Sequence, residues 1–235
     1  MSISPHFYYI KENVCMLTPE QIENNKNRFL SLVEKIERSY DKERLIKQLT
    51  CSDFFTAPAS SIYHNAFEGG LCVHCLNVYD TLVKMCHALY DEYDENGEYK
   101  GFNCPYSEET LIIVALFHDF DKMNKYERTV KNQKKYWEGG TKYDEMGKFD
   151  WVSVAGYKRK DDKDVFVYGT HGENSAYMTE TFIPLSLEES CAIVNHHSVH
   201  DNPKLNNSAI FSRYHLSCLL HAADMVCAFV VETHE

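Results

Sequence analysis

The sequence predicts an all-α fold, a helical bundle that carries a small β-hairpin insertion or flap around residues 134–169. Over most of the chain, apolar residues recur at the 3.6-residue spacing of a helix, and capping sequences mark where helices begin. Between about Tyr126 and Gly169 this spacing gives way to short aromatic and β-branched segments separated by glycines, which are typical of strands.

The size and composition of the chain favour one folded unit. With 235 residues, of which 44% are hydrophobic and 13% aromatic, the chain can bury the core of one large domain. We expect a single domain over residues 1–235. In it, N-terminal helices of 1–62 pack on a core formed by 63–231, and 126–169 is the inserted flap, which has too few apolar positions for a core of its own.

The sequence gives no indication of export or of a membrane span. No window approaches the roughly 18 apolar residues that cross a bilayer. The first residues, MSISPHFYYIKEN, lack a basic segment followed by an apolar one. The nine cysteines have no framework spacing, which is typical of reduced thiols. We therefore expect a cytoplasmic protein with no membrane partner.

Three helices are expected before residue 91. Thr18-Pro19-Glu20-Gln21 combines an N-cap, a proline at the first helical position and a capping-box glutamine, which predicts a helix to about Arg38. A second helix is expected from about Asp41 to Leu49. An apolar stripe after Gly69-Gly70 predicts a third, ending near Tyr90, and the acidic residues 91–101 read as a surface loop.

The remaining elements follow from caps and β-branched runs. Ser107 can cap a helix that ends near His118. In the flap, strands are expected in 134–140, 151–158 and 164–169, with a hairpin tip at 159–164. Further helices are expected over 171–182, 187–195 and 209–231, and a loop over 198–208.

His118 and Asp119 are the strongest functional signal. They close the apolar run LIIVALFHDFDK, and helical spacing places the imidazole on the stripe that faces the core. A carboxylate beside it is hard to bury without a cation, so the pair predicts a metal ligand rather than a hydrogen-bonded core histidine. Mixed nitrogen and oxygen donors favour a first-row transition ion. Similar donors occur near the ends or inward faces of other predicted helices, namely His74, His171, His196 and Asp224, with His197 as the alternative to His196.

The charge distribution limits the ligands. A net charge of −11 argues against a protein that grips duplex nucleic acid, because phosphate neutralisation needs a basic face. One stretch beside the His-Asp pair is nevertheless basic, either as a solvated face or as a site for small anionic phosphates. It places six cations in fourteen residues, where composition alone gives about 1.4: Lys122, Lys125, Arg128, Lys131, Lys134 and Lys135.

The order of His74, His118-Asp119 and Asp224 resembles the H…HD…D signature of the HD-domain metal-dependent phosphohydrolase superfamily. The segment HNAFEGGLCVHCLNV resembles the first ligand helix of its exonuclease-like and phage-encoded branches, and LFHDFDK resembles the second. HGENS and AIVNHH resemble the added histidine segments of members with two metals, and HAADM the segment with the last aspartate. The resemblance covers roughly residues 63–231.

The resemblance implies a metal site and a reaction. One divalent ion would be held by His74, His118, Asp119 and Asp224, and Asp119 would bridge to a second ion held by His171 and His196. The ions implied are Mn, Fe, Co, Ni or Zn, with Mg as an alternative at the second site. A water activated by the metal would attack a phosphoester of a nucleotide or short oligonucleotide. The alternative is a catalytically silent HD-type module that binds a nucleotide and signals to a partner.

The remaining predicted roles concern substrate and support. Asp119 and Lys122 are the expected catalytic residues, with Lys122 neutralising a phosphate oxygen. The expected substrate-binding residues are His64, Lys122, Arg128 and Lys131. His221, three residues before Asp224, is expected to donate to a ligand carboxylate and hold it in place. The aromatic residues Tyr126, Tyr136 and Trp137 can either stack on a base or pack the flap itself.

Overall fold

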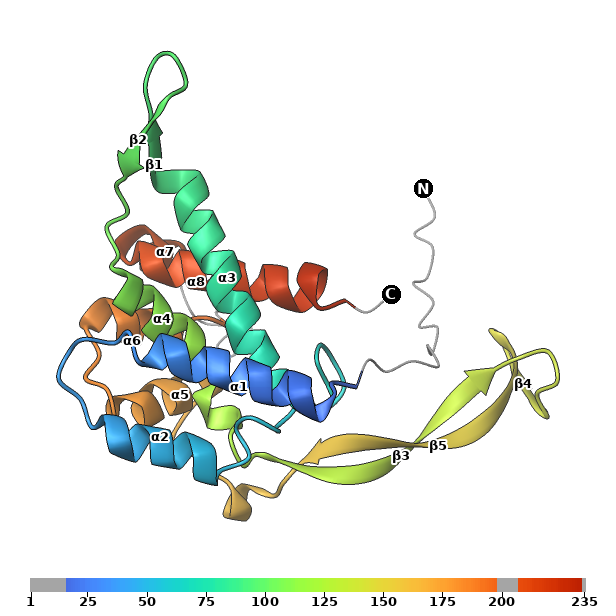
Figure 1. Ribbon diagram of the computed structural model, residues 1–235. Helices are drawn as coiled ribbons and strands as arrows, with labels where there is room; N and C mark the ends of the chain where they lie inside the picture. Colours follow the sequence, from blue (N-terminus) through green and yellow to red (C-terminus); the bar gives the residue numbers. More distant parts are fainter. Residues whose placement is uncertain (1–15, 198–206, 234–235) are drawn as a thin grey trace.

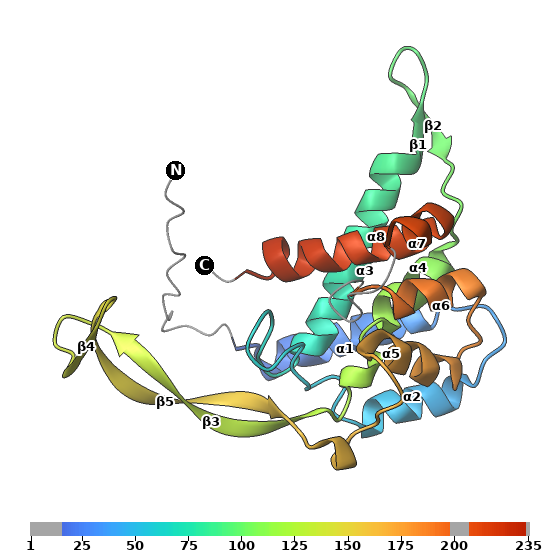
Figure 2. The same ribbon diagram turned by 180° about the vertical axis from the view of Figure 1, so that it is seen from behind.

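The computed structural model describes residues 16–197 and 207–233. A body of helices carries a long β-ribbon that extends away from it, as Figures 1 and 2 show from opposite sides. Part of the predicted loop at 198–208 lies outside the described residues. Within the described ranges, no helix is long and apolar enough to cross a membrane.

The first three helices start at their predicted signals. α1 (Pro19–Val33) begins with the Thr18–Gln21 capping box, and Asp41 caps α2 (Lys42–Cys51). α3 (Gly70–Tyr90) follows Gly69, whose φ of +84° explains the glycine at that position. α1 ends five residues before the predicted Arg38. Arg38 lies in the loop that follows, where it pairs with Glu109 and Glu189.

α4 (Glu108–Phe117) is the central helix of the body. All seven residues from Leu111 to Phe117 are buried, so this helix is covered on every side rather than along one stripe. α3, α5 (His171–Glu180) and α6 (Leu187–Val194) pack against it, and α8 (His215–Val226) packs on α3 and α6. At the end of this helix, four phenylalanine rings meet edge to face: Phe29, Phe54, Phe117 and Phe120.

The predicted all-α fold class is wrong. Half of the described residues are helical, but 16% lie in strands, arranged in two separate sheets, and the fold is mixed α/β. The first sheet occupies the predicted loop 91–101, where β1 (Asp91–Tyr93) and β2 (Tyr99–Phe102) pair antiparallel. The Asp94 carboxylate accepts from two backbone amides of this turn, and Gly97 adopts φ +82°, so turn chemistry closes a hairpin there.

The second sheet lies within the predicted flap, but its strands are longer than predicted. β3 (Tyr126–Tyr136) pairs antiparallel over its whole length with β5 (Gly147–Arg159), and β4 (Lys142–Asp144) adds to the outer end of β5. The strand predicted at 164–169 does not form, and the predicted hairpin tip at 159–164 contains a 3₁₀ turn, Asp162–Asp164. The chain reverses at 137–146 instead, because contacts across β3 and β5, such as the Tyr136–Phe149 ring pair, stabilise one continuous register.

The last predicted helix, 209–231, is divided. α7 (Asn207–Arg213) is followed by α8, and α8 continues into a π-helical segment, Cys227–Val231. The break falls at Tyr214, which has non-helical backbone angles. The wider π turns rotate less per residue than α turns, which changes the direction in which the following residues point.

Arg38, in the loop after α1, joins α4 and α6. Its guanidinium donates to both oxygens of Glu189 in α6 at 2.7 and 2.8 Å, and it also pairs with Glu109 of α4. The Glu189 side chain is 1% exposed. Burial opposes the charge of Glu189, but the hydrogen bond from Arg38 outweighs it and lowers the pKa of this carboxyl below its ordinary value.

We therefore expect Arg38→Ala to lower the free energy of unfolding by about 3 kcal/mol at pH 7, because it leaves a buried carboxylate unpaired. The exposed Arg28–Asp80 pair provides the control, and Arg28→Ala is expected to cost less than about 1 kcal/mol. Urea unfolding measures both. The effect of Arg38→Ala is expected to shrink as the pH falls through the lowered pKa of Glu189, where the wild-type pair is lost. Equal losses for the two variants at pH 7 would contradict this role.

Candidate metal centre

Five helices bring the predicted donors to one place. His74 lies in the second turn of α3, and His118 ends α4. His171 is the first residue of α5, which is fixed by the Thr170–Glu173 capping box. His196 follows the end of α6, and Asp224 lies in α8. A side chain at Gly172 would collide with the carbonyl of Val194, so glycine permits the close approach of α5 and α6 beside these histidines.

The first donor group consists of His74, His118, Asp119 and Asp224. The Nε2 atom of His74 lies 3.0 Å from Asp224 Oδ1, 3.2 Å from His118 Nε2 and 3.5 Å from Asp119 Oδ2. His118 Nε2 lies 3.6 Å from Asp119 Oδ2 and 3.9 Å from Asp224 Oδ1. Ligands about 2.1 Å from one ion stand about 3.0–3.4 Å apart when adjacent and up to about 4.2 Å apart when opposite, so separations of 3.0 to 3.9 Å allow one divalent cation to reach all four residues.

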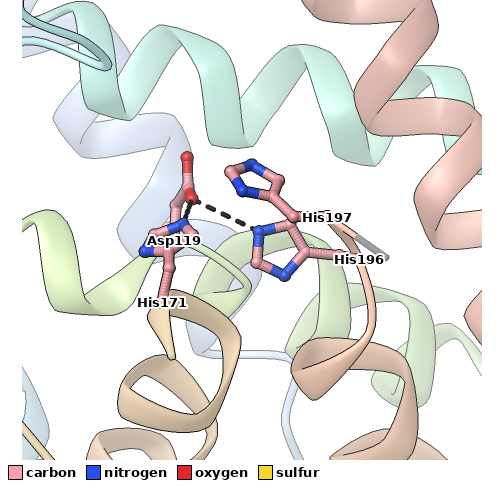
Figure 3. Close-up of side chains that lie close together, drawn as sticks. All are labelled: Asp119, His171, His196 and His197. Atoms are coloured by element: carbon pink, nitrogen blue, oxygen red, sulfur yellow. Dashed lines mark hydrogen bonds and ion pairs between the residues drawn. The ribbon is translucent and has the colours of Figure 1, made fainter. Parts of the chain in front are cut away.

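The second donor group consists of Asp119, His171, His196 and His197, whose donor atoms all lie within 4.8 Å of one another. Asp119 Oδ1 is 2.5 Å from His171 Nε2 and 3.6 Å from His196 Nε2, and Figure 3 shows the carboxylate facing both rings. His197 lies beside His196 and reaches within 3.8 Å of Asp224 Oδ2. The two oxygens of Asp119 therefore serve different groups, as a carboxylate that bridges two ions does.

Hydrogen bonds at Nδ1 turn the Nε2 atoms of three histidines toward the centre. Nδ1 of His118 donates to the carbonyl of Ala115 at 2.8 Å, and Nδ1 of His196 donates to Ile193 at 2.6 Å. Both carbonyls belong to the last turn of a helix, where carbonyls lack helical partners. Nδ1 of His74 donates to Glu232 at 3.0 Å. With Nδ1 engaged as a donor, Nε2 is the nitrogen that each ring offers to a metal.

Two supporting carboxylates were not predicted from the sequence. Glu232 lies beyond the π-helical segment, 4% exposed, and Asp121 Oδ1 lies 2.5 Å from Nδ1 of His171. The signal for Asp121 was a third polar residue within the apolar run LFHDFDK. Glu232 gave no signal: on an uninterrupted α-helix it would lie about 80° round from Asp224. The π turns bring both carboxylates to opposite nitrogens of His74.

The charges of the centre are arranged around its carboxylates. Burial raises the pKa of Asp119, but the positive charge of Lys122 and the neighbouring histidines outweigh it and hold this pKa well below its ordinary value. Burial lowers the pKa of His118 to about 3. Burial also opposes the charge of His74, yet Asp224 and Glu232 raise its pKa to about 10, and Asp121 and Asp119 raise that of His171 to about 9. The carboxylates thus favour a cation in the space between the histidine rings.

The residues fit a metal. Nε2 of His196 is buried and has no hydrogen-bond partner among the described residues, which is costly for a polar atom unless something else binds it. The clusters His74–His118–Asp119 and Asp119–His171–His196–His197 each offer at least three donor atoms to one ion. Cys72 and Cys75, the two cysteines of the CVHC segment, are buried in the core and belong to neither cluster.

The other predicted residues lie around this centre. Lys122 is buried, and its Nζ donates to Asp119 Oδ2 at 2.6 Å. The His64 ring lies 4.7 Å from that of His74. On β3, Arg128 pairs with Glu68 at 2.5 Å and Lys131 donates to the carbonyl of Ser61. His221 donates to the backbone carbonyl of His196 at 2.5 Å, so it contacts the main chain of a candidate ligand and not, as the sequence predicted, a candidate ligand carboxylate.

Comparison of the chain with known protein families, with curated proteins and with solved structures gives no match.

The two donor groups predict how many metal ions each chain binds. We expect the purified protein to hold between one and two equivalents of a transition metal, and Asp119→Ala to lose most of it, because that residue belongs to both donor groups. His171→Ala is expected to remove about one equivalent and leave the fold intact. Elemental analysis measures the metal, with Asp80→Ala, on the exposed face of α3, as the control. Full retention by Asp119→Ala would rule out this centre.

The Glu232 contact gives a separate expectation. Glu232→Gln removes the charge that orients His74 but keeps a hydrogen-bond acceptor, so we expect a 10- to 100-fold loss of metal affinity without loss of all bound metal at saturation. Competition with a chromophoric chelator measures it. An affinity equal to that of the wild type would mean that Glu232 does not support the ligand.

Proposed function

We propose that this chain is a metal-dependent phosphohydrolase or phosphodiesterase of the HD-domain type, which hydrolyses a phosphoester of a nucleotide or short oligonucleotide. The observation that carries the proposal is the carboxylate of Asp119, shared by two histidine-rich donor groups with a buried lysine at one of its oxygens. The order of the donors along the chain, His74, His118-Asp119 and Asp224, supports the same assignment.

Divalent ions at the two groups would activate a water as the nucleophile and polarise a phosphoryl oxygen. The chain itself provides the remaining functions. His74 and His171 are each held between two carboxylates, so their rings keep fixed positions. Lys122 holds a positive charge in a buried position, where it is worth more than in water and can neutralise charge that develops on phosphorus oxygens.

The net charge of the chain supports a small substrate. A chain of net charge −11 repels a long polyanion, whereas cations near the centre attract a short one. Among these cations, only Lys122 reaches Asp119 in the structure, and Arg128 and Lys131 engage the segment 61–68. We therefore assign Lys122 to the reaction and Arg128 and Lys131 to substrate affinity.

The test is a turnover assay on metal-depleted protein reloaded separately with Mn²⁺, Co²⁺, Ni²⁺, Zn²⁺, Fe²⁺ and Mg²⁺. The substrates are a panel of nucleotides and short oligonucleotides. We expect metal-dependent hydrolysis, a loss of about 100-fold or more in Asp119→Ala, and wild-type rates in His87→Ala, an exposed histidine on α3. If nucleotides raise the thermal midpoint but no metal and no substrate gives turnover, a nucleotide-binding module replaces this proposal.

The lysine and the ribbon cations should affect different kinetic constants. We expect Lys122→Ala to lower kcat, because its charge acts in the transition state, and the Arg128→Gln, Lys131→Gln double variant mainly to raise KM. Steady-state kinetics on the best substrate of the panel separates the two effects. A raised KM with unchanged kcat in Lys122→Ala would assign the lysine to binding alone.

A further inference from the structure

A recess of about 160 Å³ lies where the β3–β5 ribbon joins the helical body. The segment 56–58 and Asp53 form the side that belongs to the body, together with Glu68. Tyr126, Arg128 and Tyr157 form the side that belongs to the ribbon. Tyr126 and Arg128 are two residues apart on β3, and Arg128 is the register partner of Tyr157, so all three side chains leave the same face of the ribbon.

The recess adjoins the metal centre through Tyr126. This residue begins β3 four positions after Lys122, and burial together with the charge of Asp119 raises the pKa of its hydroxyl, against the effect of Lys122. The opposite wall is fixed to the same turn, because the backbone amide of Asn124 donates to Asp53 Oδ1 at 2.6 Å. Both walls of the recess are therefore attached to the segment 122–126, which starts at the lysine paired with Asp119.

The chemistry of the walls selects the kind of group that fits. Two carboxylates face one guanidinium, and Arg128 is already paired with Glu68 at 2.5 Å. A phosphate would be repelled by this balance, whereas N–H donors would find acceptors. Two tyrosine rings offer apolar surface for a flat ring. The recess is smaller than the roughly 300 Å³ at which pockets for whole ligands begin, so it would receive only part of a substrate.

We propose that this recess is a nucleobase subsite, which receives a base bearing an exocyclic amino group (adenine, guanine or cytosine) while the attached phosphoester lies at the metal centre. This inference rests on the proposed function and specifies its substrate. Tyr157 and Tyr126 contact the ring, and Asp53 accepts from the amino group. Uracil and thymine have no exocyclic amino group, so they lose this hydrogen bond to Asp53.

The test measures nucleoside binding without turnover. Adenosine, guanosine, cytidine and uridine contain no phosphoester, so their affinities for the purified protein, followed by NMR titration, are independent of hydrolysis. We expect the three amino-bearing nucleosides to bind more tightly than uridine. Tyr157→Ala should weaken them about 10-fold, as removal of a stacking ring does. Tyr143→Ala, a tyrosine exposed on β4 at the outer end of the ribbon, should leave them unchanged.

Asp53→Asn separates recognition from folding. The asparagine oxygen can still accept from Asn124, but its amide group adds a donor, so the preference over uridine is expected to fall while the thermal midpoint stays close to that of the wild type. The subsite is refuted if no nucleoside binds, if Tyr157→Ala and Tyr143→Ala bind alike, or if Asp53→Asn keeps the full preference. If the wild-type protein binds nucleosides as expected but hydrolyses no substrate in the turnover assay, the proposed function is contradicted and the subsite is retained.

Discussion

The charge on the buried carboxylate of Asp119 is the constraint around which the centre of this protein is organised. Asp119 is inaccessible to solvent, and an unpaired charge in such a position would cost several kcal/mol. Lys122 compensates one oxygen and His171 the other. Because these partners come from the turn after α4 and from the start of α5, the position of each helix end is tied to the same carboxylate.

Helix ends do most of the positioning in this site. His118 and His196 each follow the end of a helix, and each uses a carbonyl three residues earlier to fix the orientation of its ring. These carbonyls lie in the last turn of a helix, and the contact from Nδ1 aims Nε2 into the centre. The π-helical segment after α8 turns Glu232 toward His74, so that its carboxylate accepts from Nδ1 of that ring. The donors are thus held by main-chain geometry rather than by mobile loops.

The ribbon extends the site beyond the helical body. β3 starts four residues after Lys122, so its first residues lie near the centre, while its outer end extends away from the helical body (Figure 1). Hydrogen bonds from Lys131 to Ser61 and from Lys160 to Asn124 attach its base to the body. The ribbon therefore forms one wall of the recess beside the centre and exposes Trp137, Tyr143 and Trp151 further out.

The sequence by itself determined the starts of the main helices and the donors His74, His118, Asp119 and Asp224, because caps, apolar spacing and polar residues within apolar runs are local signals. It did not determine the fold class. The hairpin at 91–102 and the length of β3 and β5 depend on pairing between strands, which no single segment encodes. The tertiary structure alone decided that Asp121 and Glu232 support the histidines and that His221 bonds to a backbone carbonyl, since these contacts join residues up to 158 positions apart. The direction of Glu232 also depends on a local change from α to π geometry that leaves no periodic signal in the sequence.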